Sequence, residues 1–242
     1  MKTKLIIIVA FFVVRIDTHD LTPHCIAQSA NKNKPKGWTQ GFNLDECTFS
    51  STGRNTYFIL EPGYQMTLED TGAKNAVKLI ITVLNETTTI GDIEARVVEE
   101  KEIVNGSVII SSRNYYAFCT QTNSVFQFGQ RAENYKDWKA HRHSGSWRAD
   151  SGDAKPGLAM PGIILLGARY YREIAPGVAM DKVEILGNTE ALMTPAGKFE
   201  GCLRTEESSP LRPERRASKY YAPGVGLVKD GDLSLTRYGF IN

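Results

Sequence analysis

Alternating apolar and polar residues run through the middle of the chain and predict β-strands. From residue 93 onward, the apolar Ile93, Ala95 and Val97 occupy every second position. The charged Glu94 and Arg96 stand between them, and a period of two indicates a strand with one buried face. The same pattern, or a run rich in β-branched residues, predicts strands over residues 77–83, 93–104, 107–120, 125–128, 168–173, 180–186, 197–207, 217–221, 225–229 and 233–240.

Short turn motifs join these runs and favour antiparallel pairing of consecutive strands. Asn105-Gly106 is the clearest, because both residue types tolerate the positive φ of a type I′ turn. Further hairpins are expected near Asn123 and at Asp230-Gly231. The pattern predicts an all-β, mainly antiparallel fold: a single β half-barrel or barrel domain with short helices or a lid loop.

Residues 130–162 show weak periodicity and contain many Gly, Pro, Asp and Lys residues. A long irregular stretch inside a compact domain usually carries function or covers the core. This one also holds the large aromatics Tyr135, Trp138 and Trp147, which can offset the entropy cost of ordering a loop only if they are buried. We therefore expect a lid or plug over the sheet here, with function close to it.

The N-terminal residues have the pattern of a secretory leader. Lys2 and Lys4 flank the start of an apolar run at residues 5–14, which is too short to span a membrane. This predicts a signal peptide over residues 1–27, a flexible lead-in over 28–40 and a single β-rich domain over 41–242. The product is expected to be secreted or periplasmic, with no transmembrane segment after signal removal. The cleavage site and lipidation at Cys25 stay open.

The amino-acid composition argues against some classes of binding partner. Apolar residues make up 41% and charged residues 23%, as in an ordinary globular protein. The 29 basic and 27 acidic side chains leave a net charge of +2, which argues against nucleic-acid binding through bulk charge. A small apolar ligand or a protein partner fits this composition, and no motif calls for a cofactor.

Several stretches of the chain resemble a family of exported bacterial proteins of uncharacterised function. The resemblance covers roughly residues 55–230 and implies an exported, β-rich protein without assigning a reaction. The sequence departs from the pattern at residues 150–153 (DSGD), where Asp-Gly is expected before the alanine. The matching pieces are residues 55–63 (NTYFILEPG), 145–147 (GSW), 154–161 (AKPGLAMP), Glu173, Pro176-Gly177, Asp181, 205–207 (TEE), Pro210-Leu211 and 219–228 (KYYAPGVGLV).

Three cysteines, Cys47, Cys119 and Cys202, remain after the predicted signal peptide. Export permits a disulfide bond, and an odd number gives one bridge with one buried thiol. Three buried, unpaired thiols are the alternative. The wide spacings argue against a structural zinc site.

Two histidines form a candidate metal site. His141 and His143 are two residues apart, so they would share one side of a strand and could bind Zn or Cu, with Asp150 or Asp153 completing the site. An exposed polar loop with two histidines is the simpler interpretation, because the spacing identifies no third or fourth ligand.

Carboxylates and aromatics supply the candidate ligand contacts. Glu206 and Glu207 are adjacent, so in a strand they face opposite sides and cannot act as a direct pair. Ion pairs of these residues with Lys219 or Arg204 are the simpler expectation. The full set of candidate ligand-binding residues is Tyr135, Trp138, Trp147, Glu173, Asp181, Glu206 and Tyr220.

These features favour a non-catalytic exported module that binds an apolar or amphipathic ligand, or a partner protein. The crowding of aromatics and the lack of a complete catalytic motif support this hypothesis. The alternative is a metal-assisted or carboxylate-dependent hydrolase with its site around residues 130–162.

Overall fold

Antiparallel strands joined by tight turns make up most of the chain. The structure is a computed structural model that describes residues 37–70, 72, 76–136, 139–142 and 145–241. A single 3-10 turn, η1 (Leu44–Glu46), is the only helical element in these ranges. The strands are β1 (Phe49–Ser50), β2 (Gly53–Asn55), β3 (Phe58–Leu60), β4 (Tyr64–Glu69), β5 (Val77–Ile90), β6 (Ile93–Val104), β7 (Ser107–Cys119), β8 (Ser124–Lys136), β9 (Lys139–Arg142), β10 (Trp147–Arg148), β11 (Gly157–Met160), β12 (Arg169–Tyr171), β13 (Lys182–Thr194), β14 (Gly197–Ser209), β15 (Arg212–Ala222), β16 (Gly226–Asp230) and β17 (Leu233–Phe240).

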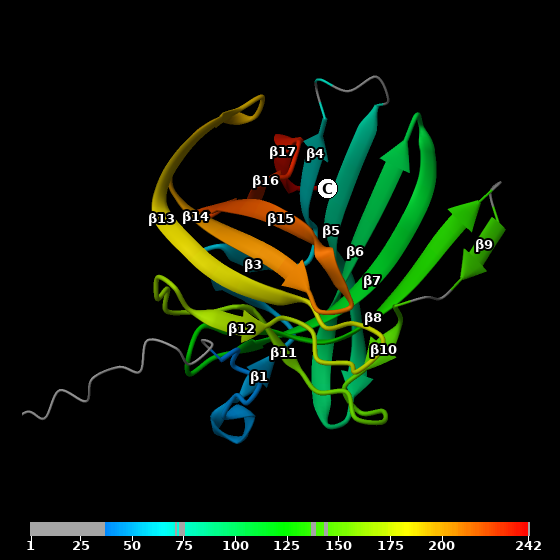
Figure 1. The fold of residues 1–242 in the computed structure, drawn as a ribbon, viewed down its shortest axis with the longest axis vertical. Coiled ribbons are helices and arrows are strands. Elements are labelled where there is room, and N and C mark those ends of the chain that lie inside the picture. Colours follow the sequence, from blue (N-terminus) through cyan, green and yellow to red (C-terminus); the bar gives the residue numbers. More distant parts are fainter. Residues whose placement is uncertain (1–36, 71, 73–75, 137–138, 143–144, 242) are drawn as a thin grey trace, which may run out of the picture. The chain divides into compact units, whose positions relative to one another are not determined.

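One large sheet contains 15 of the described strands. Its order is β10-β8-β7-β6-β5-β4-β17-β16-β15-β14-β13-β12, with β1 paired to β7 and with β9 and β11 paired to β8. Among the described strands, the order ends at β10 and β12, which do not pair with each other, so the sheet does not close. The prediction of an all-β, mainly antiparallel fold is confirmed, and the prediction of a closed barrel is wrong. Strands β4 to β8 form one arm of this sheet and β13 to β15 curve round as the other (Figure 1).

The predicted turns lie where the sequence placed them. Asn105 and Gly106 have φ values of 50° and 83°, and they join β6 to β7. Asn123, at φ 54°, closes the turn between β7 and β8, and Gly231, at φ 56°, follows Asp230 between β16 and β17. The three hairpin predictions are confirmed.

The described part of residues 130–162 contains more strand than the weak periodicity suggested, and residues 149–156 form an irregular connection. Strand β8 continues to Lys136, and β9, β10 and β11 all pair with it. The far half of β8 shows little alternation because Arg131 is exposed and its neighbours are only half-buried. Backbone pairing with residues 110–114 of β7 supports this half of the strand. The pattern of apolar residues therefore gives no signal for this half of β8.

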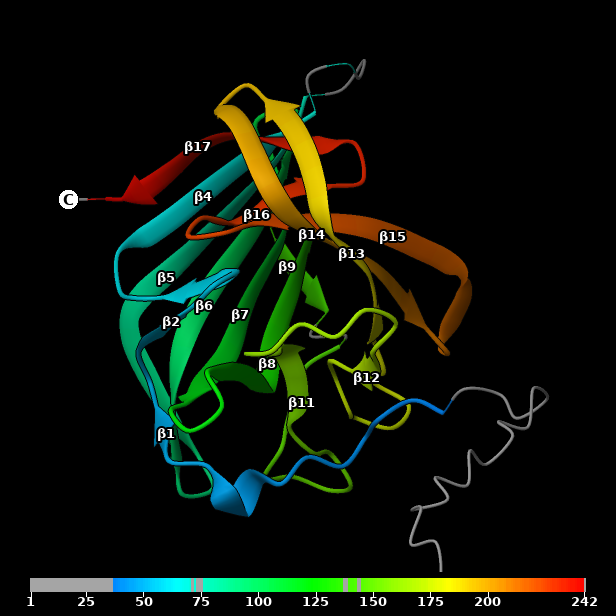
Figure 2. The same ribbon diagram turned by 90° about the vertical axis from the view of Figure 1, so that its left-hand side faces the viewer.

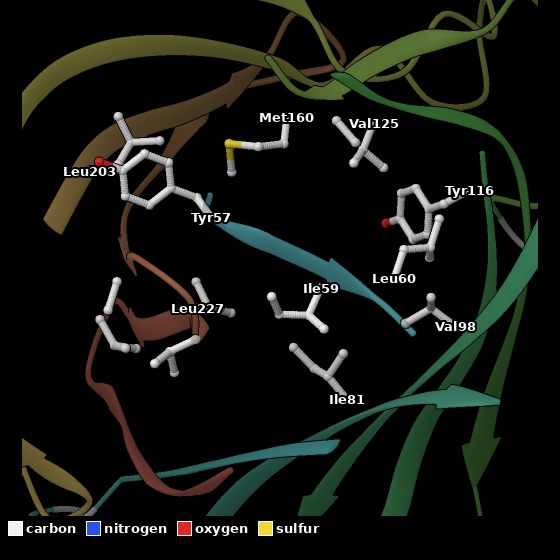
Figure 3. Packing of buried hydrophobic residues seen from close by; sticks show 14 of the residues in the cluster. Tyr57, Ile59, Leu60, Ile81, Val98, Tyr116, Val125, Met160, Leu203 and Leu227 are labelled. Carbon is white, nitrogen blue, oxygen red and sulfur yellow. The ribbon is translucent and has the colours of Figure 1, made fainter. Parts of the chain in front are cut away.

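A short hairpin occupies the interior instead. Strands β2 and β3 form a separate two-stranded sheet, and β3 runs between the two arms of the large sheet (Figures 2 and 3). Tyr57, Ile59 and Leu60 are buried in the main core, which contains Val98 of β6 and Leu203 of β14. This hairpin fills much of the space between the arms, and Ala159 and Met160 of β11 pack in the same core.

Tight contacts hold the interior hairpin in place. A Cβ atom at Gly53 would lie 2.5 Å from the ring of Phe118, so glycine lets β2 approach β7 closely. The buried Asn55 accepts a hydrogen bond from the backbone N–H of Tyr57 at 2.8 Å. Its amide donates to the carbonyl oxygens of Asn123 and Pro161, at 2.6 and 3.1 Å. The hairpin is thereby fixed to the β7–β8 turn and to the segment after β11.

The cysteines follow the first of the two sequence alternatives. Cys47 and Cys119 form a disulfide bond that ties the segment before β1 to the end of β7, and Cys202 is buried and free. Which cysteines would pair could not be read from the spacing.

Residues 37–242 form one compact unit. The predicted signal peptide and most of the lead-in lie outside the described residues, but Trp38 and Thr39 at its end contact β12. Thr39 donates to the Arg169 carbonyl at 3.0 Å and accepts from the Tyr171 N–H at 2.9 Å. Within the described ranges, no helix has the length and apolar character needed to cross a membrane.

Candidate functional site

An apolar cavity of about 70 Å³ lies beside the interior hairpin. Its wall combines side chains of β3, β4, β5 and β6 with Leu227 of β16. Four charged residues, Glu100, Arg172, Lys219 and Asp230, complete the wall. The apolar lining consists of Tyr57, Phe58, Ile59, Met66, Leu79, Ile81, Val83, Val98, Tyr116, Tyr221, Gly226 and Leu227.

A larger polar cleft of about 490 Å³ opens to solvent on the other side of those charged residues. Glu100, Arg172 and Lys219 line both the cavity and the cleft, so they form the boundary between the two. Glu173 and Asp181 line the cleft as well. The molecule therefore places an apolar cavity and a polar cleft back to back.

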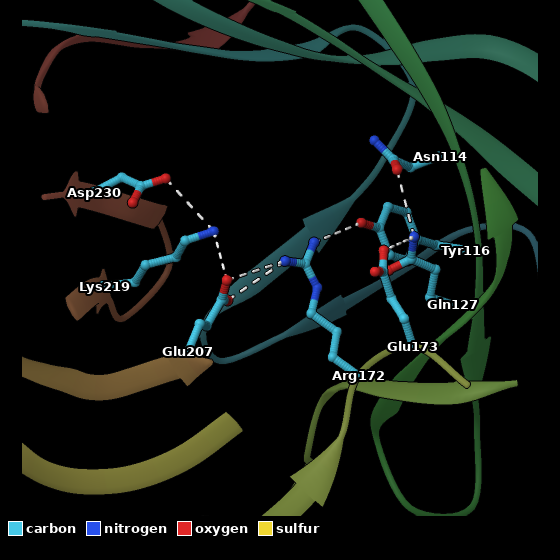
Figure 4. Close-up of polar contacts among 8 residues, drawn as sticks. All are labelled: Asn114, Tyr116, Gln127, Arg172, Glu173, Glu207, Lys219 and Asp230. Atoms are coloured by element: carbon cyan, nitrogen blue, oxygen red, sulfur yellow. Dashed lines mark hydrogen bonds and ion pairs between the residues drawn. The ribbon is translucent and has the colours of Figure 1, made fainter. Parts of the chain in front are cut away.

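A row of ionised groups crosses this boundary (Figure 4). Glu207 of β14 accepts from the guanidinium of Arg172 at 3.4 Å and pairs with the Lys219 ammonium at 2.9 Å. Lys219 also lies 3.5 Å from the Asp230 carboxylate. At the other end, Arg172 donates to the hydroxyl of Tyr116 on β7 at 3.1 Å. The row thus links the two arms of the sheet.

The row keeps its charges despite burial. Burial alone would raise the pKa of Glu207, but the charges of Lys219 and Arg172 and hydrogen bonds from Lys219 and Tyr221 hold it below its ordinary value. Burial alone would lower the pKa of Lys219, which the charges of Glu207 and Asp230 instead raise well above the ordinary value. Each charge therefore depends on its neighbours.

A second polar cluster lies at the edge of the cleft. The side-chain amide of Gln127 donates to Glu173 at 3.1 Å and to Asn114 at 3.4 Å (Figure 4). Burial raises the pKa of Glu173 to about 7, and the charges of Asp181 and Glu207 act in the same direction, while Arg172 and the bond from Gln127 oppose it. Glu173 thus changes charge near neutral pH.

Strand alternation explains how β14 and β15 contribute to the site. Leu203, Thr205 and Glu207 occupy every second position of β14, so they share its inner face. Lys219 pairs with Thr205 across the ladder and lies diagonally from Glu207 on the same face. The predicted ion pair between Glu207 and Lys219 is confirmed.

Local backbone geometry explains why the consecutive residues Arg172 and Glu173 both line the cleft. The N–H groups of both residues donate to the carbonyl of Asp181, at 2.8 and 3.1 Å, which bends the chain and interrupts alternation. A Cβ atom at Gly157 would lie 2.1 Å from the Arg172 carbonyl oxygen, so only glycine permits β11 to pack against this bend. Sequence periodicity gives no signal for such a bend.

Only part of the predicted ligand set meets at the cleft. Glu173 and Asp181 line it. Glu206 lies on the outer face of β14 and pairs with Arg216, and Tyr220 lies under the guanidinium of Arg204.

Two of the predicted aromatic residues, Tyr135 and Trp147, lie apart from this boundary. Tyr135 donates to Glu133 at 2.7 Å, and Trp147 is buried against Ala175 and Ala179. His141 belongs to β9, but its side chain, like Trp138 and His143, lies outside what the structure describes. No group of three metal-ligating side chains comes together in the described part of the chain.

No family model and no curated protein matches the chain. Among solved structures, it is similar to a protein from Parabacteroides distasonis ATCC 8503 called a "putative lipoprotein". The two share 14% identity at a TM-score of 0.32, over 77% of this chain and 100% of the other. Function therefore has to be argued from the residues of the chain itself.

Replacing Glu207 tests the ionic row. Glu207→Gln leaves Arg172 and Lys219 without their shared negative charge and should lower the free energy of unfolding by about 2–4 kcal/mol. Glu206→Gln is the matched control, because it removes an exposed ion pair from the adjacent position and should cost less than about 0.5 kcal/mol. Urea unfolding at neutral pH measures both. Equal losses would show that the row does not stabilise the fold.

Replacing Glu173 tests its raised pKa. A carboxyl whose pKa rises from 4.5 to about 7 on folding binds its proton more tightly in the folded state, so its ionisation lowers stability as the pH rises through that window. Glu173→Gln removes this effect. The variant should match the wild type near pH 4 and exceed it by roughly 2–3 kcal/mol near pH 8. A variant less stable than the wild type at the higher pH would contradict the assignment.

Proposed function

We propose that the chain is an exported β-sheet module that binds a small amphipathic ligand. The apolar part of the ligand occupies the cavity beside β3, and its polar group lies in the cleft. The observation that carries the proposal is the shared boundary: Glu100, Arg172 and Lys219 line both spaces. A ligand that crosses it would meet apolar walls at one end and polar groups at the other.

The pairing of charges at the boundary favours a ligand whose polar group is a cation or a hydrogen-bond donor. The two cations of the row are already engaged by Glu207 and Asp230. Among the described residues, Glu100, Glu173 and Asp181 form no ion pair, and all three line the cleft. An alkylammonium group would supply the missing positive charge.

Two features support export. The leader-like pattern at residues 5–14 predicts secretion, and the disulfide bond between Cys47 and Cys119 is of a kind that persists in oxidising compartments.

Butylammonium is a suitable probe for this proposal, because a cavity of about 70 Å³ holds a chain of no more than about four carbons, and butanoate and butanol are the headgroup controls. Calorimetric titration near pH 8, where Glu173 is ionised, should show butylammonium binding most tightly. Met66→Trp places a ring in the cavity and should weaken binding at least about tenfold. Met193→Trp makes the same change at an exposed position and should leave binding unchanged.

Two results would overturn the proposal. One is the absence of binding by all three probes to correctly folded protein. The other is equal affinity in the Met66→Trp and Met193→Trp variants, which would place the alkyl chain outside the cavity.

A further inference from the structure

Residues 161–167 (PGIILLG) expose three large aliphatic side chains on one short loop. The exposed fractions of Ile163, Leu165 and Leu166 are 76%, 64% and 63%. Single exposed apolar residues are ordinary, but a cluster of this size on a surface loop marks an interaction site. None of the three lines the cavity or the cleft, so this site is separate from the one described above.

The loop is held rigidly in this exposed position. Asn55 donates to the Pro161 carbonyl at 3.1 Å, the Gly162 N–H donates to Ser124 at 3.1 Å, and the Gly167 N–H donates to the Ile185 carbonyl at 2.8 Å. Ile164 packs against the main core. The loop thus partly buries one of its four aliphatic residues. It turns the other three outward, although collapse onto the protein surface would hide them from water.

Close packing at Gly162 sets the path of the loop. A Cβ atom there would lie 1.8 Å from the Thr122 carbonyl oxygen, so only glycine fits against the β7–β8 turn. The exposed aliphatics are therefore displayed by specific contacts at both ends of the loop rather than by a loose segment.

A tryptophan and two cations lie beside the loop. Arg169 follows Gly167 by two residues, and its guanidinium lies 5.5 Å from the centre of the Trp38 ring. The Lys182 ammonium lies 4.4 Å from the same ring and forms no ion pair among the described residues. Glu184 neutralises Arg169, through contacts of 2.8 Å, which leaves the edge with positive charge from Lys182.

We propose that this loop docks the protein onto an anionic phospholipid surface. Aliphatic side chains on an exposed loop, with a tryptophan and a lysine at the strands that follow it, have the composition of a bilayer-binding site, where apolar groups enter the acyl region and Trp and Lys lie among the headgroups.

The size of the exposed cluster favours lipid over a protein partner. A stable protein interface buries about 800 Å² on each side, with a complementary surface. Three side chains on one loop supply only a small part of such an area, whereas a fluid lipid surface adapts to an exposed loop without a preformed pocket. The docking site therefore requires only the loop and the charges beside it.

Vesicle flotation tests this inference, with protein purified after expression of the whole chain. The vesicles contain phosphatidylcholine alone or with about 30% phosphatidylglycerol. The wild type should float with the anionic vesicles and be released by salt. The triple variant I163S/L165S/L166S should bind at least about tenfold more weakly. The double variant M193S/I241S is the control, because it removes apolar side chains that are exposed elsewhere and line neither the cavity nor the cleft, and it should bind as the wild type does.

Because all three loop side chains are exposed, the triple variant should unfold at the wild-type temperature, and butylammonium binding at the cleft should persist. Equal flotation of the triple variant and the wild type would overturn the proposal, as would a wild type that binds neither vesicle. A concentration-dependent dimer that the triple variant abolishes, without vesicle binding, would assign the loop to self-association instead.

Discussion

The carboxylate of Glu207 joins parts of the fold that are distant in the sequence. Through Arg172 it connects β14 to Tyr116 on β7, and through Lys219 it connects β14 to β15 and to Asp230 at the end of β16. Taking these groups out of water is costly, so each is stable only while its partners stay in place. The two arms of an open sheet, which share no backbone hydrogen bonds at this point, are held at a fixed separation by this row.

That separation determines what lies between the arms. The hairpin of β2 and β3 fills much of the space with Tyr57, Ile59 and Leu60. The apolar cavity remains where the hairpin ends against the ionic row. The charges of the row are paired with one another. The row can therefore separate the apolar cavity from the aqueous cleft without leaving one of its own charges unpaired. The same interactions that close the fold thus create a boundary at which an amphipathic molecule can be held.

Local signals in the sequence predicted the local parts of this structure. Asn105-Gly106 and Asp230-Gly231 specify their turns through the backbone conformations they tolerate, and alternation around residues 93–97 specifies a strand with one buried face. The adjacency of Glu206 and Glu207 correctly indicated opposite faces, with Lys219 as the partner of one of them. These predictions needed only the geometry of neighbouring residues.

Long-range packing could not be predicted in the same way. Whether the sheet closes depends on the sum of twist and register over many strands, which no single segment encodes. The extension of β8 was missed because its side chains are not sorted between a core face and a solvent face, and backbone pairing supports it. Arg172 and Glu173 both reach the cleft because one carbonyl accepts from two amides, a contact made with Asp181 eight residues further on.

Nuclear Overhauser contacts to the methionine methyl groups test the central claim most directly. The protein carries methyl-labelled methionine and is mixed with butylammonium. The account predicts contacts between the alkyl protons and the methyl group of Met66, which lines the cavity, and none to the exposed Met193. Contacts to Met193 without contacts to Met66 would place the alkyl chain outside the cavity and contradict the account.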